Sequence, residues 1–278
     1  MDDFKYSVLM SVYAKENPEH LKLAIESIMN QTLKPSQIVV VKDGPLTSEL
    51  DLVLNNFIKK HKGLFKVIKI KNNVGLGKAL NEGLNSCEYP YIARMDSDDI
   101  SLPKRCEKQI ERFKKRNNLS VVGTWIDEFY DEVTNVVTRR EVPLTHEAIK
   151  KFSKRRSPFN HPTVMYKKED VLAVGGYREL EKSQDFDLFV RMIDNNFICE
   201  NIGESLLLYR TNVNNFKRRK TLKKCSGNIK LMYSFWKMGH SSFFDFILVS
   251  LLNVLAFITP TWIFSKMANT FLRKKVNS

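Results

Sequence analysis

The chain has 278 residues, 43% of them hydrophobic and 27% charged, and a formal net charge of +14. This composition is that of a globular protein and excludes collagen-like or low-complexity chains. The length suffices for one large domain with an appendage. The basic excess favours an anionic partner, either nucleic acid, a phosphorylated substrate or an acidic membrane surface, although a generically basic protein would have the same charge.

The four cysteines are far apart and form no CxxC pair: Cys87, Cys106, Cys199 and Cys225. This spacing argues against a zinc or redox site and favours reduced thiols. The first residues, MDDFKYSVLMSVY, begin with acidic residues and contain no long apolar run, so we expect no secretory signal.

The first half of the chain alternates short apolar runs with helical patterns. Asn17 and Pro18 are typical of a helix N-cap and first turn. We expect strands at 6–12, 37–41, 65–70 and 91–95, and helices at 18–30, 49–60, 76–84 and from Pro103 onward. This order predicts an α/β fold with a mostly parallel, doubly wound sheet.

The second half has a different pattern. We expect a strand at 121–124, a hairpin at 126–139, a helix at 146–153, a strand at 163–166, a helix at 185–195 and a strand at 205–209. From these patterns we divide the chain into an α/β domain, 1–212, and a basic and apolar helical region, 213–278.

The C-terminal region combines charge with apolar residues. Residues 217–224 contain six basic residues, and the apolar stretch 243–264 is interrupted by Asp245, Asn253 and Pro260. A spanning helix needs roughly 20 apolar residues, so this stretch is marginal. Its basic flanks favour a helix that lies in or dips into an anionic leaflet, with a buried helix pair as the alternative.

Polar residues follow each of the first four predicted strands. In parallel sheets, ligands bind beyond the carboxyl ends of the strands, where these side chains would meet. They are Ser11, Tyr13, Asp43, Asn73, Asp96 and Asp98. Asp96 and Asp98 offer the carboxylate oxygens that Mg²⁺ or Mn²⁺ prefers, although a solvated acidic turn or a helix cap would also explain them.

Two common nucleotide motifs are missing. Gly75 and Gly77 lack the third glycine of GxGxxG, because Leu80 stands there, and they follow the third strand instead of the first. No GxxxxGK[ST] loop occurs. The sequence therefore argues against nicotinamide-dependent oxidation and P-loop hydrolysis.

Five segments in order resemble the family-two glycosyltransferases of the GT-A fold: SVLMSVYAKENPEHLKLAIESIMNQT, VVVKDGP, NNVGLGKALNEGL, RMDSDD and SQDFDLFVRM. The resemblance covers roughly residues 5–212. It is greatest with bacterial enzymes of O-antigen, capsule and exopolysaccharide assembly. It implies an inverting hexosyltransferase that uses a UDP-sugar and Mn²⁺ or Mg²⁺.

The resemblance also implies roles for single residues on the donor side. Asp96 would lie near the ribose and the metal, and Asp98 would be the main metal ligand. Arg94 would position the diphosphate, or would pair with Asp96 or Asp98. The residues expected around the nucleotide are Ser11, Val12, Tyr13, Asp43 at the uracil edge, Asn73 and Lys78, which could instead be a surface lysine.

On the acceptor side, Asp185 resembles the family's catalytic base and follows Gln184, in a position usually occupied by Glu or Gln. A carboxylate within hydrogen-bond reach of the acceptor hydroxyl can take its proton. The alternatives are that Asp185 only caps a helix, or that Asp187 is the base. His161 would line the acceptor side or be structural. Asn212 stands where relatives often have a histidine, which puts the completeness of the metal shell in doubt.

We therefore expect an enzyme that acts on a polyprenyl-diphosphate-linked saccharide at the cytoplasmic face of the bacterial inner membrane, as a peripheral or monotopic protein. A sugar-nucleotide-binding protein or nucleotidyltransferase is an alternative, disfavoured because YAKENPEH lacks a glycine-rich loop. We expect no nucleic-acid partner, because no recognition helix or RNA-binding signature is present.

Overall fold

The computed structural model describes residues 4–130, 132–180, 182–211, 221–259 and 274–275. Its first half alternates strands and helices as predicted. The elements are β1 (Tyr6–Val12), α1 (Pro18–Met29), β2 (Gln37–Asp43), α2 (Ser48–Lys60), β3 (Phe65–Ile70), α3 (Leu76–Ser86) and β4 (Tyr91–Met95). The Asn17 side chain accepts the N–H of Glu19 at 2.8 Å, so α1 begins where the sequence predicts.

The second half departs further from the prediction. Its elements are β5 (Ile100–Ser101), α4 (Arg105–Lys115), β6 (Leu119–Phe129), β7 (Val136–Arg140), α5 (His146–Ser153), the 3₁₀ turn η1 (His161–Thr163), β8 (Met165–Lys167), α6 (Lys168–Ala173), α7 (Gln184–Asp194) and β9 (Ile198–Arg210). β6 is one long strand where two segments were expected, and β9 begins seven residues earlier than predicted. Neither β5 nor α6 was predicted.

The sheet is mixed. Strands β3, β2, β1 and β4 are parallel neighbours, but β8 is antiparallel to β4, and β6 is antiparallel to both β8 and β7. β9 then runs parallel to β6. The prediction of a mostly parallel sheet is thus correct for the first four strands and wrong for the whole. A short connection joins β6 to β7, and a parallel pair would need a crossover of a dozen or more residues.

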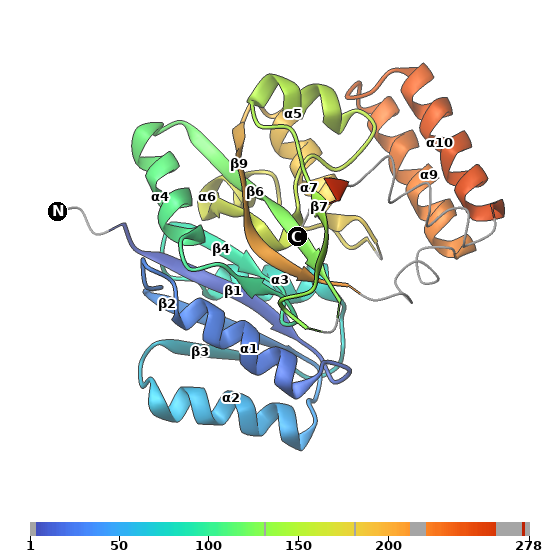
Figure 1. Ribbon diagram of the computed structural model, residues 1–278. Helices are drawn as coiled ribbons and strands as arrows, with labels where there is room; N and C mark the ends of the chain where they lie inside the picture. Colours follow the sequence, from blue (N-terminus) through green and yellow to red (C-terminus); the bar gives the residue numbers. More distant parts are fainter. Residues whose placement is uncertain (1–3, 131, 181, 212–220, 260–273, 276–278) are drawn as a thin grey trace.

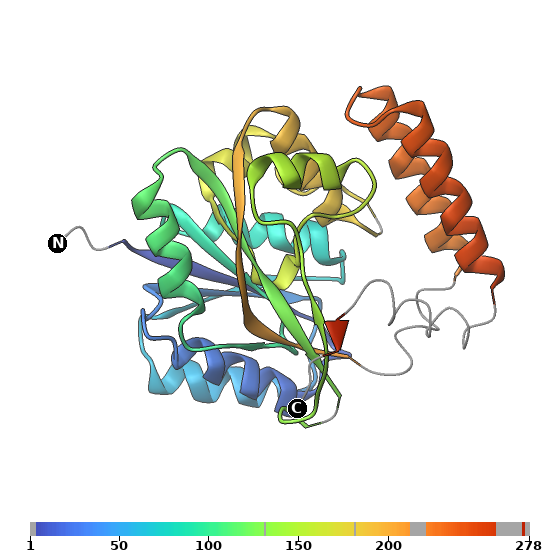
Figure 2. The same ribbon diagram turned by 45° about the horizontal axis from the view of Figure 1, so that its top comes forward.

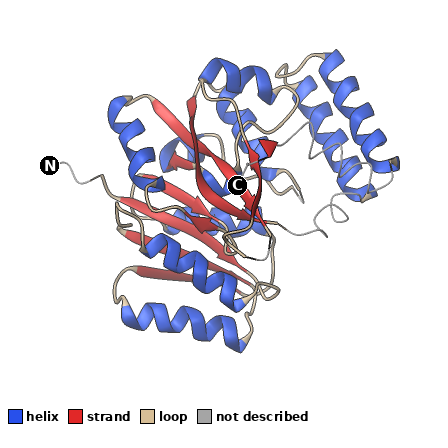
Figure 3. Cartoon of the chain, viewed as in Figure 1, coloured by secondary structure: helices blue, strands red, loops and turns tan. Residues whose placement is uncertain are grey.

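Helices cover both faces of this sheet (Figures 1 and 3). On one face, β1 buries Val8 and Met10 against α1, α2 and α4. On the other, Leu9, Val39 and Val41 pack against α3 and α7. Alternate residues of β1 therefore enter two different cores, which explains why its sequence is apolar throughout.

The C-terminal region contains two helices, α9 (Leu222–Lys237) and α10 (Phe243–Ile258), followed by the short strand β10 (Lys274–Lys275). The two helices form an antiparallel hairpin beside the α/β fold (Figures 1 and 2). None of the described helices is long and apolar enough to cross a membrane. Residues 217–220 and 260–264 of the predicted basic and apolar stretches, and Asn212, lie outside the described residues.

A matched pair of glycines tests the packing of α3. A Cβ at Gly83 would lie 2.3 Å from Leu9 Cδ1 and 2.7 Å from Val41 Cγ2, whereas a Cβ at Gly227 in α9 would meet nothing within 4 Å. We expect Gly83→Ala to lower the free energy of unfolding by about 1–3 kcal/mol. Gly227→Ala should raise it by up to about 1 kcal/mol, because alanine favours helix. Urea denaturation measures both, and changes of the same sign would contradict this packing.

Candidate active site

The carboxyl ends of three neighbouring strands lie level with one another. Val12 pairs with Lys42 across β1 and β2, and Met10 pairs with Met95 across β1 and β4. Ser11, Tyr13 and the acidic residues after β4 therefore share one edge of the sheet. Tyr13 is 41% exposed there, and Val12 beneath it is buried.

Asp43 and Asn73 are brought into direct contact at this edge. The Asp43 carboxylate accepts the Asn73 Nδ2 group at 3.0 Å and the backbone N–H groups of Val74 at 2.7 Å and Gly75 at 3.1 Å. A Cβ at Gly44 would lie 2.9 Å from the backbone nitrogen of Asn73. The loop after β2 and the loop after β3 therefore approach too closely for a larger residue at position 44. In this structure Asp43 holds the loop before α3.

Three acidic residues gather after β4. Asp96, Asp98 and Asp99 can each place a carboxylate oxygen within 4.8 Å of the others'. Asp99, which the sequence analysis did not include as a ligand, accepts the backbone N–H of Arg210 at 2.9 Å through Oδ1. Its Oδ2 atom is buried and has no hydrogen-bond partner among the described residues. An orphaned carboxylate oxygen in such a cluster fits a divalent cation.

Electrostatics also favour a cation here. Burial and the charges of Asp96 and Glu16 raise the pKa of Asp98 to about 7. Burial and the neighbouring Asp98 raise the pKa of Asp99 well above its ordinary value. Three carboxylates of like charge are costly together unless a positive charge offsets them. The residues present therefore suit Mg²⁺ or Mn²⁺.

Glu16 is a fourth carboxylate that sequence reasoning missed. Its Oε2 atom accepts the Ser97 hydroxyl at 2.6 Å, and its Oε1 atom accepts the Asn17 N–H at 2.9 Å. The loop after β1 is thereby tied to the middle residue of the Asp96–Asp98 motif. The one available signal was an acidic residue three positions after Tyr13 on a predicted ligand-binding loop.

Arg94 lies at the centre of the site. Its side chain is almost fully buried, and one terminal nitrogen pairs with Asp96. Its Nε and Nη1 atoms are buried without a hydrogen-bond partner among the described residues. The charge of Arg94 lowers the pKa of both Asp98 and Asp185, so the two carboxylates lie within electrostatic reach of one guanidinium. Residues 87 positions apart in the sequence thus feel the charge of the same side chain.

Asp185 stands in the first turn of α7 and is half-buried. Burial raises its pKa, while the N–H of Phe186 and the charges of Arg94 and Arg140 lower it. Ser183 before it has a left-handed backbone, with φ of 59°, and makes no side-chain cap. A partly buried carboxylate of raised pKa at the edge of a site has the properties of a general base.

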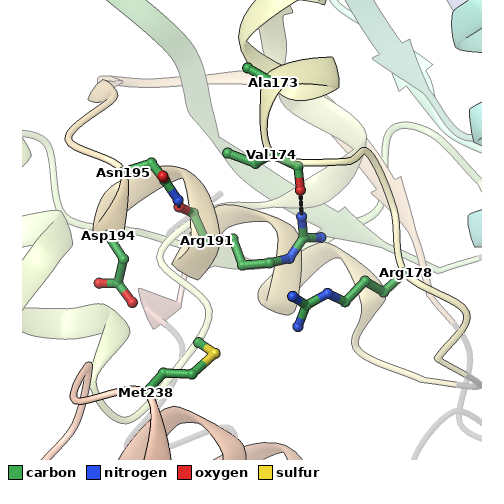
Figure 4. A pocket seen from close by; sticks show the side chains of 7 residues that line it. All are labelled: Ala173, Val174, Arg178, Arg191, Asp194, Asn195 and Met238. Atoms are coloured by element: carbon green, nitrogen blue, oxygen red, sulfur yellow. Dashed lines mark hydrogen bonds between the residues drawn. The ribbon is translucent and has the colours of Figure 1, made fainter.

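Asp187, the alternative base, is committed to an ion pair. It is 2% exposed and accepts Arg191 Nε and Nη2, both at 2.8 Å. Arg191 also donates to the carbonyl of Val174, beside a cavity of about 400 Å³ at the far end of α7 (Figure 4). Asp187 therefore anchors the loop before α7, which argues against its acting as the base.

The remaining predicted residues are buried or paired. His161 is buried, and its Nε2 atom lies 2.9 Å from the Tyr177 hydroxyl. Burial and Arg94 keep the pKa of His161 well below its ordinary value, so the ring is neutral. The Gln184 side chain lies against Gly77 of α3. Lys78 pairs with Glu179 at 2.9 Å on the surface.

Comparison with known sequences identifies the family. A sequence profile described as "Glycosyl transferase family 2" matches residues 7–174. The chain belongs to this family. The chain is 36% identical to an uncharacterized glycosyltransferase of Haemophilus influenzae, over 97% of this chain and all of the relative. It is 33% identical to the Escherichia coli UDP-Gal:alpha-D-GlcNAc-diphosphoundecaprenol beta-1,3-galactosyltransferase, over 98% of this chain and 99% of that relative.

Other relatives of this family-two glycosyltransferase include the amylovoran biosynthesis glycosyltransferase AmsE of Erwinia amylovora, 32% identical over 81% of this chain and 84% of AmsE. Among solved structures, Pyrobaculum calidifontis mannosyltransferase PcManGT with GDP-Man and Mn²⁺ has a TM-score of 0.64 at 10% identity, over 95% of this chain and 73% of that one. TarS 1–349 of S. aureus with UDP-GlcNAc has a TM-score of 0.61 at 16% identity, over 96% of this chain and 73% of that one. These structures support a GT-A-like α/β fold.

The raised pKa of Asp98 predicts pH-dependent metal binding by this glycosyltransferase. Below about pH 7 the Asp98 carboxyl is protonated in the metal-free protein and must lose that proton to bind an ion. We expect Mn²⁺ affinity to fall by about tenfold per pH unit below this value. Calorimetric titration between pH 6 and 8 measures it.

Glu16→Gln is the matched variant, because it removes one of the charges that raise the pKa of Asp98. The fall in affinity should begin at a lower pH in this variant than in the wild type. A Mn²⁺ affinity that is constant over this range in the wild type would be incompatible with the proposed ligand set.

Proposed function

We propose that this family-two glycosyltransferase moves a sugar, with inversion, from a UDP-sugar to a polyprenyl-diphosphate-linked saccharide during synthesis of a bacterial surface polysaccharide. The observation that carries the proposal is that Arg94 pairs with Asp96 and that its charge acts on both Asp98 and Asp185, so the acidic triad and Asp185 lie within reach of one guanidinium. The Escherichia coli relative, named for a UDP-Gal donor and a diphosphoundecaprenol acceptor, matches almost the whole chain.

On the donor side, the nucleoside would lie over Ser11, Val12 and Tyr13, with its uracil edge near Asp43. Asn73 and Lys78 would flank the nucleotide on the side of α3. Lys78 would release Glu179 and pair with phosphate instead. Asp96, Asp98 and Asp99 would hold Mg²⁺ or Mn²⁺, whose charge would offset that of the departing diphosphate. Because Arg94 is buried, it would act by holding Asp96 in place and would not reach into solvent for the phosphates.

On the acceptor side, Asp185 would accept the proton of the attacking hydroxyl. The hydroxyl oxygen forms a bond to the anomeric carbon as the bond to the diphosphate breaks on the opposite face, which inverts the configuration. His161, held neutral against Tyr177, and Gln184 would line this side. A lipid-linked acceptor would place the enzyme at the cytoplasmic face of the inner membrane, as a peripheral or monotopic protein with an anionic lipid surface as partner.

A transfer assay tests the function. Purified full-length protein is incubated with Mn²⁺, a panel of labelled UDP-sugars and a diphosphate-linked GlcNAc acceptor with a lipid tail. We expect metal-dependent transfer from one donor and stabilisation of the protein against heat by that donor. Absence of transfer from every UDP-sugar to any diphosphate-linked acceptor would refute the proposal.

The role of Asp185 is tested by comparing two substitutions in α7. Asp185→Asn should reduce turnover by about 10²- to 10⁴-fold, since the base is lost, and leave UDP affinity unchanged. Its melting temperature should not fall, because burial disfavours the charged form of Asp185 in the folded protein. Asp187→Asn should instead lower the melting temperature, because it leaves Arg191 buried without its partner. Wild-type turnover in Asp185→Asn would remove the base assignment.

A further inference from the structure

The outer face of α10 is apolar along its whole length. Its large side chains are between 39% and 66% exposed at the positions that the argument uses: Phe243, Phe244, Ile247, Leu251, Leu255 and Ile258. The helix contains one charged residue, Asp245, which is buried, caps the helix with Ser242 and pairs with Arg155. An exposed apolar surface that runs along a whole helix marks a site of contact with another molecule or a lipid surface.

The opposite face of α10 already has its partners. Phe246 and Val249 pack on the cluster shared by α9 and α7, and Asn253 accepts Asn228 Nδ2 at 2.9 Å. The exposed face is therefore a second surface that the hairpin itself does not cover. With 16 residues, α10 is about 24 Å long, which is shorter than the roughly 30 Å hydrocarbon core of a bilayer.

The surroundings of this face favour anionic lipid as its partner. Lys237 lies over the rings of Tyr233 and Trp236, at 5.7 and 5.1 Å from their centroids, and Trp236 contacts Phe243 of α10. Tyrosine, tryptophan and lysine together are typical of the boundary between lipid tails and head groups. Lys223 and Lys230 are also exposed on α9. A second copy of this basic chain would bring like charges together, which disfavours a dimer through this face.

The hairpin is joined firmly to the helix that carries Asp185. Phe186 and Val190 of α7 pack against Leu231, Met232 and Phe235 of α9. At the other end of α7, Asp194 accepts His240 Nδ1 at 2.6 Å, and His240 Nε2 lies 3.0 Å from the Ser153 hydroxyl. In both views the hairpin stands on the side toward which the carboxyl ends of β1 and β2 point (Figures 1 and 2).

We infer that the outer face of α10 inserts along the surface of an anionic leaflet without crossing it, and that the contacts of α7 with the hairpin hold Asp185 at the membrane-facing side of the site. The inference rests on the proposed function for the identity of the acceptor. It adds the surface that binds lipid and a physical link from that surface to the proposed base. A lipid-linked acceptor then approaches Asp185 from the bilayer, while the nucleotide enters from water.

Vesicle flotation tests the surface with the full-length protein. Vesicles of phosphatidylcholine alone are compared with vesicles enriched in phosphatidylglycerol. We expect binding to the anionic vesicles, and a loss of at least about tenfold in Leu251→Ser/Leu255→Ser. The control, Leu52→Ser/Leu172→Ser, removes two leucines that are 61% and 43% exposed on other helices, and should bind as the wild type does. UDP-induced thermal stabilisation reports that each variant is folded.

A second variant tests the charge contribution. Lys223→Gln/Lys230→Gln/Lys237→Gln leaves the apolar face intact and should reduce binding to anionic vesicles, with little effect on the melting temperature. Equal binding of Leu251→Ser/Leu255→Ser and the wild type would overturn the inference. The inference would also be overturned if the wild type were a dimer in light scattering and Leu251→Ser/Leu255→Ser were a monomer that binds vesicles as the wild type does. The face would then join two copies of the chain.

The same variants test the link to catalysis. Transfer to an acceptor embedded in anionic vesicles should fall in Leu251→Ser/Leu255→Ser to the extent that vesicle binding falls. Undiminished transfer to the embedded acceptor would overturn the link between the lipid surface and Asp185. Failure of the wild type to glycosylate any lipid-linked acceptor would instead refute the proposed function, and the flotation result would stand independently.

Discussion

The candidate site depends on one buried guanidinium. Arg94 stands near the end of β4 and pairs with Asp96, and its charge opposes the rise that burial causes in the pKa of Asp98 and of Asp185. Without this charge, the carboxylates after β4 would repel one another more strongly in a region of low dielectric. Two of the Arg94 nitrogens are buried and have no hydrogen-bond partner among the described residues, so Arg94 acts on the site through its charge and its pair with Asp96.

The mixed sheet brings residues from distant parts of the chain to the candidate site. The parallel strands β1, β2 and β4 bring the predicted donor residues to one edge. There Asp43 at the end of β2 accepts a hydrogen bond from the loop before α3, and Glu16 after β1 accepts one from Ser97 after β4. The antiparallel strands and β9 then continue the sheet, and β9 reaches the acidic triad through Arg210. Helix α7 packs against the second core and carries Asp185 in its first turn. The residues that we propose for the donor and for the acceptor therefore come from different elements of one fold.

The C-terminal hairpin adds a third element to this arrangement. Because it packs on α7 through Phe186 and Val190, any surface that binds the hairpin also orients the first turn of α7. The basic net charge of the chain, which alone could indicate nucleic acid, is also compatible with the anionic lipid and diphosphate groups that we propose as partners of this family-two glycosyltransferase.

The sequence by itself determined the elements whose signals are local. The buried run of β1, the Asn17–Pro18 start of α1 and the acidic cluster after β4 are read directly, because capping and strand burial depend on neighbouring residues. The tertiary structure alone decided the antiparallel half of the sheet, the inclusion of Asp99 and Glu16 in the acidic site, and the ion pair that removes Asp187 as a base. These depend on pairing and charge between residues far apart in the chain, and no local pattern of side chains encodes such distances.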